Sequence, residues 1–402
     1  MNVKIYPSKA EGKAIAPPSK SVAHRALICG ALSGRSVIDN VAFSKDVTAT
    51  LNCLSALGAG CSTDNDSVTL GGLNAFDPNE SIVLDCFESG STLRFLIPLC
   101  LISGKEITLK GANRLFERPL SIYEAICREQ GMLFEKNENS VTLCGPLKSG
   151  NYRVNGDVSS QFISGLLFAL PLLDGVSIVE IVGKLESASY VDITLGVLSD
   201  FGIKITRVGN RFIILGNQRY QGREYTVEGD YSNAAFLDAF NLIGGNVELC
   251  GLSHNTLQGD AAYKKIFEGL ENGKKNFDLS DCPDLAPVLF ALAAVKGGAT
   301  FTGTARLKIK ESDRGEAMAR ELKKFGVPVT VGENHVEIGS TFIKAPTETL
   351  FGHNDHRIVM ALAVLCSIVG GEIQGAEAIS KSYPDFFKVI QQLNIGLSTD
   401  EN

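Results

Sequence analysis

Hydroxyl groups and cations gather at the starts of six strongly apolar segments of this chain. The starts read PSKSVAHR, ESGSTLR, GDVSSQF, GDYSNAA, DCPDLAP and NDHR. Ser, Asp and Gly are ordinary helix N-caps, and we interpret Ser232 and Asn233 in that way. Four cations need another explanation, because the helix dipole disfavours positive charge in a first turn. They are Lys20, Arg25, Arg94 and Arg357. Anions bound at the helix ends would explain them, since free N–H groups and basic side chains can share an anion.

Carboxylates and further cations stand in loops that interrupt the apolar pattern. The cations are Arg118 in NRLFERP, Lys310 and Arg314 in KIKESDR, and Lys381 in SKSYPDF. The carboxylates are Asp284 in CPDLAP, Glu311 and Asp313 in KESDR, and Asp355 in NDHR. A few carboxylates among many cations suit proton transfer on phosphorylated or carboxylated substrates. We expect Asp313 and Asp355 to orient the neighbouring Arg314 and Arg357, because a carboxylate beside arginine stays ionised.

Several cofactors and partners are disfavoured by what the sequence lacks. It has no GxxxxGK[ST] phosphate loop, no GxGxxG dinucleotide turn, and no HExxH or paired Cys/His spacing for a metal. Its 38 Lys and Arg against 45 Asp and Glu give a net charge of −7, which argues against a general nucleic-acid binder. The residues alone therefore indicate a cofactor-free transferase or lyase that acts on small polyanions in a locally positive cleft.

One structural unit recurs six times. Each copy has a small glycine turn between an apolar helix and a β-forming run, as in SGKEITLKG. The turn glycines are 53 to 73 residues apart and are Gly34, Gly104, Gly175, Gly245, Gly298 and Gly371. Most copies continue with an amphipathic helix ending in glycine and with alternating strands such as VTLCG. Because a helix that is apolar all round must be buried all round, the pattern predicts an α/β fold of two lobes, each with three buried helices wrapped by sheets.

In this order the motifs resemble the 3-phosphoshikimate 1-carboxyvinyltransferases, or 5-enolpyruvylshikimate-3-phosphate synthases. The resemblance covers essentially the whole chain and adds NRLFERPL, LESASYVDIT and SKSYPDFF to the helix starts. It implies an inside-out α/β barrel of six βαβαββ repeats, three in each of two lobes. Residues 19–226 would form the first lobe, and residues 1–18 and 227–402 the second. The crossover hinges would lie near residues 17–18 and 227–228.

The resemblance also implies a reaction of the shikimate pathway, which leads to chorismate and the aromatic amino acids. The carboxyvinyl group of phosphoenolpyruvate passes to the 5-hydroxyl of 3-phosphoshikimate, and phosphate is released. Phosphoenolpyruvate is protonated at its methylene carbon, the hydroxyl attacks the resulting cationic carbon, and phosphate leaves by C–O cleavage. Neither a cofactor nor a metal takes part. The inhibitor glyphosate competes with phosphoenolpyruvate in this family.

Site residues follow from the same resemblance. Those implied for 3-phosphoshikimate are Lys20, Ser21, Arg25, Ser159, Ser160, Gln161, Ser187, Asp284 and Lys310, with Tyr190 against the ring. Those implied for phosphoenolpyruvate are Lys20, Gly90, Arg118, Gln161, Arg314, Arg357 and Lys381. The catalytic set is Lys20, Asp284, Glu311 and His356. Asp284 would be the base at the 5-hydroxyl and Glu311 the proton donor, while His356 would support Glu311 or the leaving phosphate.

Some of these residues have simpler interpretations. Ser159 and Ser160 could be plain helix caps, and Tyr190 an ordinary half-buried aromatic residue. His24 begins a buried helix and is expected to be structural. Two positions depart from the family pattern. Glu88 replaces the usual asparagine before the S-G-[ST] turn and should repel phosphoenolpyruvate unless an arginine neutralises it, and Arg306 replaces an asparagine that contacts the shikimate ring in some members.

Two rival functions fit less well. UDP-N-acetylglucosamine enolpyruvyl transferases share the fold and phosphoenolpyruvate, but usually carry a cysteine that GANRLFERP lacks. A ring-forming DNA clamp also has six similar units, but would need basic helix faces. The start, MNVKIYPSKAEG, has no apolar signal-peptide core, no apolar run reaches the ~20 residues of a membrane span, and the ten cysteines form no CxxC pair. We therefore expect a cytoplasmic monomer with free thiols that binds neither nucleic acid nor membrane.

Overall fold

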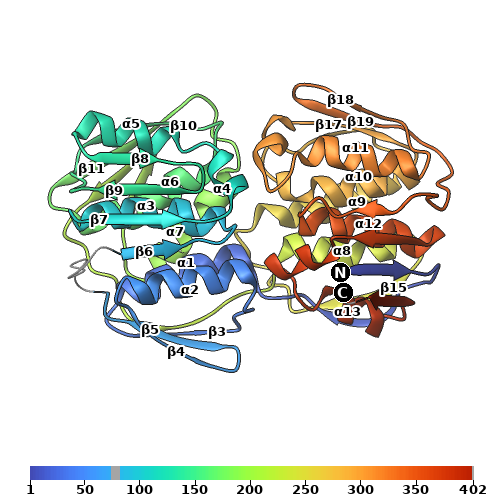
Figure 1. The fold of residues 1–402 in the computed structure, drawn as a ribbon, viewed down its shortest axis with the longest axis horizontal. Helices are drawn as coiled ribbons and strands as arrows, with labels where there is room; N and C mark the ends of the chain where they lie inside the picture. The colour runs from blue at the N-terminus through green and yellow to red at the C-terminus, as the bar shows by residue number, and fades with distance from the viewer. Residues whose placement is uncertain (74–81, 401–402) are drawn as a thin grey trace. The chain divides into compact units, whose positions relative to one another are not determined.

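The computed structural model describes residues 1–73 and 82–400 (Figure 1). It contains six β-sheets, and each sheet is linked in sequence to one strongly apolar helix. The chain divides into two compact units. Unit 1 comprises Met1–Pro17 and Gly229–Asn402, and unit 2 comprises Pro18–Glu228. Each unit has a hydrophobic core of its own.

Unit 2 contains three four-stranded sheets, in the strand orders β14-β3-β5-β4, β6-β7-β9-β8 and β10-β11-β13-β12. Its helices are α1 (Lys20–Leu32), α2 (Lys45–Ala56), α3 (Gly90–Ile102), α4 (Asn113–Glu117), α5 (Ser121–Gln130), α6 (Ser160–Ala169), the 3₁₀ helix η1 (Leu170–Leu172) and α7 (Ala188–Asp200). Its strands are β3 (Ser36–Asp39), β4 (Gly60–Asp64), β5 (Ser67–Gly71), β6 (Ile82–Asp85), β7 (Glu106–Lys110), β8 (Leu133–Lys136), β9 (Ser140–Cys144), β10 (Asn151–Asn155), β11 (Val176–Val182), β12 (Ile205–Val208), β13 (Arg211–Leu215) and β14 (Glu224–Thr226).

The sheets of unit 2 share one topology. In two of them the strand before the apolar helix pairs in parallel with the strand after it, as β6 pairs with β7, with Ile82 opposite Ile107, and as β10 pairs with β11. An antiparallel hairpin then extends the sheet, as β8 and β9 do beside β7. The first sheet is completed by β14 from the end of the unit, which pairs in parallel with β3 so that Tyr225 lies opposite Ile38.

Unit 1 contains two four-stranded sheets, in the orders β16-β17-β19-β18 and β20-β21-β1-β22, and the two-stranded sheet β15-β2. Its helices are α8 (Tyr231–Leu242), η2 (Gly259–Ala262), α9 (Tyr263–Glu271), η3 (Pro283–Leu285), α10 (Ala286–Val295), η4 (Ala305–Ile309), α11 (Arg314–Lys324), α12 (His356–Val369), η5 (Ala376–Lys381) and α13 (Phe386–Gln392). Its strands are β1 (Asn2–Ile5), β2 (Glu11–Ile15), β15 (Asn246–Cys250), β16 (Asn276–Asp278), β17 (Ala299–Thr302), β18 (Val329–Val331), β19 (His335–Ile338), β20 (Leu350–Phe351), β21 (Gly371–Gln374) and β22 (Leu397–Asp400).

The predicted α/β fold with buried apolar helices is confirmed. Every residue of α10 except Val295 is buried, and burial of such apolar side chains is the main force that holds each core together. One repeat is shorter than predicted, because the sheet β15-β2 lacks the antiparallel hairpin. The shortest spacing between turn glycines, from Gly245 to Gly298, falls in this repeat and leaves fewer residues for a hairpin. Within the described ranges no sheet closes into a barrel, and no helix is long and apolar enough to cross a membrane.

The apolar helices begin where side chains accept hydrogen bonds from first-turn N–H groups. Ser19 caps α1, Ser89 caps α3 and Asp355 caps α12, with the Asp355 Oδ1 3.0 Å from the Arg357 nitrogen. The cap of α8 is Asp230, which accepts from Asn233 at 2.8 Å. The interpretation of Ser232 and Asn233 as caps was therefore wrong, because α8 already begins at Tyr231 and both residues lie in its first turn.

Candidate active site

Arg314 is the centre of a charged cluster in unit 1. Its side chain is fully buried at the start of α11. Nε donates to Asp355 Oδ2 at 2.8 Å, Nη1 to Asp284 Oδ1 at 2.7 Å, and Nη2 to Glu311 Oε2 at 2.7 Å. Burial alone would lower the pKa of Arg314, but the three carboxylates outweigh it and hold the pKa well above its ordinary value. One guanidinium thus fixes the positions of three carboxylates.

Asp284 is surrounded by three cations. Besides Arg314, the Lys310 Nζ donates to its Oδ1 at 3.2 Å and the Arg357 Nη2 to its Oδ2 at 3.0 Å. Burial would raise the pKa of Asp284, yet Arg357, Lys310 and Arg314 together hold it well below its ordinary range. The same burial lowers the pKa of Lys310, partly opposed by Asp284. Asp284 is therefore ionised at neutral pH.

Arg357, in the first turn of α12, contacts the same cluster. The Arg357 Nη1 donates to Ser232 Oγ at 2.8 Å and to the Asp284 carbonyl at 3.2 Å. Lys381, buried at the end of η5, donates to the Asn354 carbonyl at 2.6 Å. The structure thus brings together six of the residues that the sequence singled out. They are Asp284, Lys310, Glu311, Arg314, Asp355 and Arg357.

The two aspartates that precede arginines have different surroundings. Asp355 contacts Arg314 directly and also accepts from Ser312 Oγ at 3.1 Å. Asp313 instead caps α11 by accepting from the Glu316 nitrogen at 3.2 Å. Asp355 therefore orients the Arg314 side chain, not that of Arg357 as expected, and it meets Arg357 at the backbone nitrogen. The main contact of Asp313 is with the helix backbone.

Two further residues of unit 1 had been singled out. His356 is buried as the first residue of α12. Arg306 is buried in η4, and its Nη2 donates to the Ser280 carbonyl at 2.6 Å. This hydrogen bond gives the buried guanidinium a partner and links η4 to the segment that follows β16.

In unit 2, Lys20 and Arg25 lie on α1 with their polar groups already engaged. The Lys20 Nζ donates to Asp46 Oδ2 at 2.7 Å, across from the start of α2. Arg25 is buried, and burial lowers its pKa to about 10. Its guanidinium donates to Thr194 Oγ1 at 2.7 Å and to the carbonyls of Ser21 and Tyr190 at 2.6 and 2.9 Å. Asp46 lies outside the motifs that the sequence singled out, whereas Thr194 is the last residue of LESASYVDIT.

Two arginines converge on Gly90 at the start of α3. A β-carbon at Gly90 would lie 2.6 Å from the Arg118 Nη1 and 2.9 Å from the Arg94 Nη1. Arg94 also donates to Gln161 Oε1 at 3.1 Å, and Gln161 Nε2 donates to Ser91 Oγ at 3.0 Å. Gly90, Arg94, Arg118 and Gln161 therefore form a second group of cations and polar side chains at a helix start, the arrangement that suits an anion.

The remaining predicted residues lie at the starts of α6 and α7. Ser159 caps α6 by accepting from Gln161, and Ser160 is buried beside it. Ser187 is buried ahead of α7 in a left-handed backbone conformation, with φ 54°. Tyr190 is half-buried and packs against the hydrophobic core. Glu88 is half-buried in the turn before α3.

His24 anchors a chain of hydroxyl groups inside unit 2. Its Nδ1 lies 2.8 Å from Thr50 Oγ1, which lies 2.6 Å from Thr92 Oγ1, which in turn donates to Ser89 Oγ at 2.7 Å. Burial, reinforced by Lys20 and Arg25, holds the pKa of His24 well below its ordinary value of 6.5. This geometry supports the structural role expected for His24.

The buried His24 predicts a pH dependence of stability. In the unfolded chain the imidazole binds a proton below about pH 6.5, whereas in the folded chain it stays neutral until a much lower pH. Unfolding therefore takes up a proton, and stability falls as the pH drops below about 6.5, by at most ~1.4 kcal/mol per pH unit. We expect the unfolding free energy of His24→Asn to vary less steeply between pH 7 and 5 than that of wild type. The control is the exposed His254→Asn, and equal slopes for wild type and His24→Asn would contradict the assignment.

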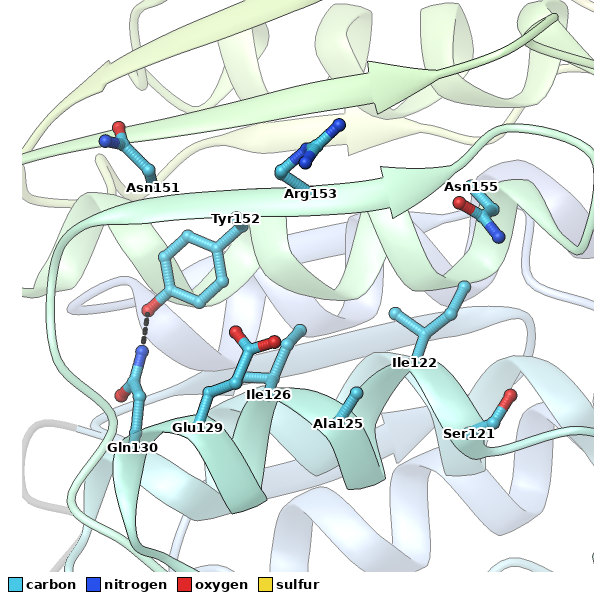
Figure 2. Close-up of a pocket in the computed structure, with 10 residues that line it drawn as sticks. All are labelled: Ser121, Ile122, Ala125, Ile126, Glu129, Gln130, Asn151, Tyr152, Arg153 and Asn155. Atoms are coloured by element: carbon cyan, nitrogen blue, oxygen red, sulfur yellow. Dashed lines mark hydrogen bonds between the residues drawn. The ribbon is translucent and has the colours of Figure 1, made fainter.

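A different pocket, of about 370 Å³, lies between α5 and β10 (Figure 2). Figure 2 shows Gln130 and Tyr152 directed at one another, with the Gln130 Nε2 3.1 Å from the tyrosine hydroxyl. Its lining contains one cation, Arg153, and one carboxylate, Glu129. None of the predicted site residues lines it, and it lacks the converging cations that a polyanionic substrate needs.

Comparisons with known proteins agree with the motifs. A family model described as EPSP synthase (3-phosphoshikimate 1-carboxyvinyltransferase) matches residues 6–390. A 3-phosphoshikimate 1-carboxyvinyltransferase of Clostridium kluyveri is 44% identical over 97% of each chain. One of Clostridium novyi is 40% identical over 98% of this chain and 97% of the relative. The solved EPSP synthase of Acinetobacter baumannii has a TM-score of 0.78 at 24% identity and covers 99% of this chain and 100% of its own, a likeness of fold.

Proposed function

The chain belongs to the EPSP synthase (3-phosphoshikimate 1-carboxyvinyltransferase) family, and we propose how its residues carry out that family's reaction. The enzyme transfers the carboxyvinyl group of phosphoenolpyruvate to 3-phosphoshikimate, at the 5-hydroxyl, and releases phosphate. The observation that carries the proposal is the Arg314 cluster. It combines three cations and three carboxylates in buried or half-buried, hydrogen-bonded positions, as proton transfer on an anionic substrate requires.

Phosphoenolpyruvate is bound by cations that the free protein already holds in place. We assign to it Arg314, Arg357 and Lys381 of unit 1, and Lys20, Gly90, Arg118 and Gln161 of unit 2. The buried Arg314 and Arg357 support this assignment, because planar guanidinium groups can bind carboxylate and phosphate through paired hydrogen bonds. Holding these cations by carboxylates before binding limits the entropy that is lost when the substrate arrives.

3-Phosphoshikimate is assigned to a second set of side chains. In unit 2 these are Lys20, Ser21, Arg25, Ser159, Ser160, Gln161 and Ser187, with Tyr190 against the ring. In unit 1 they are Asp284 and Lys310. The helix starts that carry the serines support this assignment, because first-turn N–H groups and hydroxyls can share a phosphate.

Asp284 and Glu311 divide the proton transfers between them. Asp284 accepts the proton of the 5-hydroxyl, and Glu311 donates to the methylene carbon, which becomes a methyl group. The methyl group returns a proton as phosphate leaves, so that the double bond is restored. With three cations around it, Asp284 is ionised but weakly basic. When anionic substrates bind beside Asp284 and share the charge of Arg314, Arg357 and Lys310, the pKa of Asp284 rises and it becomes a stronger base. His356 supports Glu311 or the leaving phosphate.

The cysteines bear on the compartment in which the enzyme acts. All ten cysteines are free thiols, which is typical of a reducing compartment, and we propose that the protein acts in the cytoplasm as a monomer on these two small substrates. We also propose that the chain crosses between two three-repeat lobes near residues 17–18 and 227–228. The division into compact units between Pro17 and Pro18 and between Glu228 and Gly229 supports that boundary.

Phosphate release tests the proposed function. Purified protein is incubated with phosphoenolpyruvate and each of three acceptors in turn, 3-phosphoshikimate, shikimate and UDP-N-acetylglucosamine. We expect rapid release of phosphate only with 3-phosphoshikimate. Release with UDP-N-acetylglucosamine instead would move the protein to the other enolpyruvyl transferases, and release with no acceptor would mark it as a phosphatase.

Gly90→Ala should shift the balance between substrate and inhibitor. The added methyl group would lie 2.6 Å from the Arg118 Nη1, so the guanidinium group must move. Because glyphosate is longer than phosphoenolpyruvate, we expect its inhibition constant to rise about tenfold more than the KM for phosphoenolpyruvate, ~1.4 kcal/mol. Steady-state inhibition measures both, with Gly34→Ala as the control because its added methyl meets nothing within 4 Å and its backbone is not in the left-handed region. Equal losses for both ligands would show that Gly90 does not shape this pocket.

A further inference from the structure

The turn that leads into α12 holds two residues in an unfavourable backbone conformation. His353 and Asn354 are consecutive and have φ angles of 49° and 52°. Left-handed conformations are costly for residues with a β-carbon, although asparagine tolerates them better than most. Such a turn persists only where its surroundings hold it in place.

Glu321 of α11 binds the segment that leads into this turn. Its side chain is 2% exposed. The Oε1 lies 2.8 Å from the His353 Nε2, and the Oε2 accepts from Lys324 Nζ at 2.9 Å and from the Phe351 nitrogen at 3.0 Å. Burial would raise the pKa of Glu321, but the hydrogen bonds from His353, Lys324 and Phe351 outweigh it, so the carboxylate is ionised at neutral pH. The carboxylate therefore binds the segment before the turn through both its side chain and its backbone.

Helix α11 contacts the chain around this turn at a second point, through Arg314. Arg314 lies seven residues before Glu321, which puts the two side chains on one face of the helix. While Glu321 holds Phe351 and His353, Arg314 contacts Asp355 at 2.8 Å on the far side of the turn. The Asn354 carbonyl between them accepts from Lys381 at 2.6 Å. The geometry of the turn thus decides where Lys381, Asp355 and the start of α12 lie.

We propose that Glu321 is a positioning residue for phosphoenolpyruvate binding, acting through His353 and Phe351 to fix the turn that sets Lys381, Asp355 and Arg357 in place. Glu321 itself is outside both sets of substrate ligands. The inference rests on the proposed function, since it takes Arg314, Arg357 and Lys381 as ligands of phosphoenolpyruvate. It predicts a selective defect, because the ligands assigned to 3-phosphoshikimate in unit 1, Asp284 and Lys310, are not part of the turn.

The test compares the two substrates in Glu321→Gln, which keeps the size of the side chain but removes its charge. We expect the KM for phosphoenolpyruvate to rise about 10- to 100-fold, while the KM for 3-phosphoshikimate stays within about threefold of wild type. Glu316→Gln makes the same change at an exposed position on α11 and should leave both constants unchanged. A second variant, His353→Asn, removes the imidazole contact but keeps a residue that tolerates the left-handed conformation. It should raise the KM for phosphoenolpyruvate about 3- to 10-fold.

The outcomes separate this inference from the proposed function. If wild type releases no phosphate with 3-phosphoshikimate, the function is wrong. If wild type is active but folded Glu321→Gln and His353→Asn both keep the wild-type KM for phosphoenolpyruvate, Glu321 does not position its ligands. Equal increases of both KM values would likewise overturn the inference, because they indicate a general loss of structure. Circular dichroism spectra and melting curves of each variant verify folding. If Glu321→Gln does not fold, the KM of His353→Asn for phosphoenolpyruvate decides whether the contact with Glu321 matters.

Discussion

Asp284→Asn is expected to lower turnover by about 10²–10⁴, the contribution of general acid–base catalysis. Asparagine has nearly the same shape, and its carbonyl oxygen can still accept from Lys310 or Arg314, but it cannot take up the proton of the 5-hydroxyl. Affinity for 3-phosphoshikimate should therefore stay within about tenfold, a change under ~1.4 kcal/mol. Steady-state phosphate release gives the turnover, and calorimetric titration with 3-phosphoshikimate gives the affinity.

The matched control for this variant is Asp281→Asn. It makes the same change three residues earlier, at an exposed position, and should retain wild-type turnover. If Asp284→Asn turned over within about tenfold of wild type, the base would have to be another group. If turnover and affinity fell together, Asp284 would serve in binding and not in proton transfer.

Arg314→Met should cause a large loss of stability. It removes the cation that contacts Asp355, Asp284 and Glu311, and it leaves the fully buried Asp355 charge close to the half-buried Asp284 and Glu311. Breaking a buried ion pair in this way costs about 3–5 kcal/mol, because the partner charge remains buried without compensation. Binding of phosphoenolpyruvate should be lost as well. Because the chain contains no tryptophan, urea unfolding is best followed by circular dichroism.

Acid should reduce the difference between Arg314→Met and wild type. With the arginine gone, the crowded carboxylates bind protons more readily, and protonation relieves their repulsion. The stability difference should therefore be greatest near neutral pH and shrink as the pH falls below about 5, where carboxylates begin to be protonated. Arg320→Met, at an exposed position of the same helix, should cost little at any pH. A constant difference across the pH range would mean that packing, and not charge, makes Arg314 important.

The fold was predictable from the sequence because its signals are local. Apolar helices such as α10 and α12 are buried on all sides, and their sequences are apolar on all sides. The turn glycines marked the repeats, and even the short repeat has its cause in the close spacing of Gly245 and Gly298. The cations at helix starts were found in the same way, since each stands next to a helix boundary that the sequence makes visible.

The contacts between distant residues could not be predicted in this way. Lys20 pairs with Asp46, Arg357 with Ser232, and His353 with Glu321. These pairs join segments that lie far apart in the sequence, and no motif marks Asp46 or Glu321 as a second partner. Ser232 did stand in the helix-start pattern, but it was taken for a cap because a serine at that position usually is one.

The two aspartates before arginines show the same limit at short range. Asp313 stands directly before Arg314 and Asp355 two residues before Arg357, yet it is Asp355 that contacts the Arg314 side chain. Both aspartates cap helices with one carboxylate oxygen. In Asp355 the second oxygen also accepts from Arg314 and Ser312, which come from another part of the chain. That depends on the packing of α11 against the turn before α12, which the sequence of either motif does not contain.

The division of acid–base work between Asp284 and Glu311 is tested most directly by deuterium exchange. Wild type, Asp284→Asn and Glu311→Gln are incubated in D₂O with both substrates, and NMR follows deuterium in the methylene group of phosphoenolpyruvate. A proton donated by Glu311 enters the methyl group, and its return exchanges the methylene hydrogens with solvent. We expect exchange in wild type, slow exchange in Asp284→Asn, and none in Glu311→Gln. Exchange at the wild-type rate in Glu311→Gln would contradict the account and leave Lys20 or Lys381 as the donor.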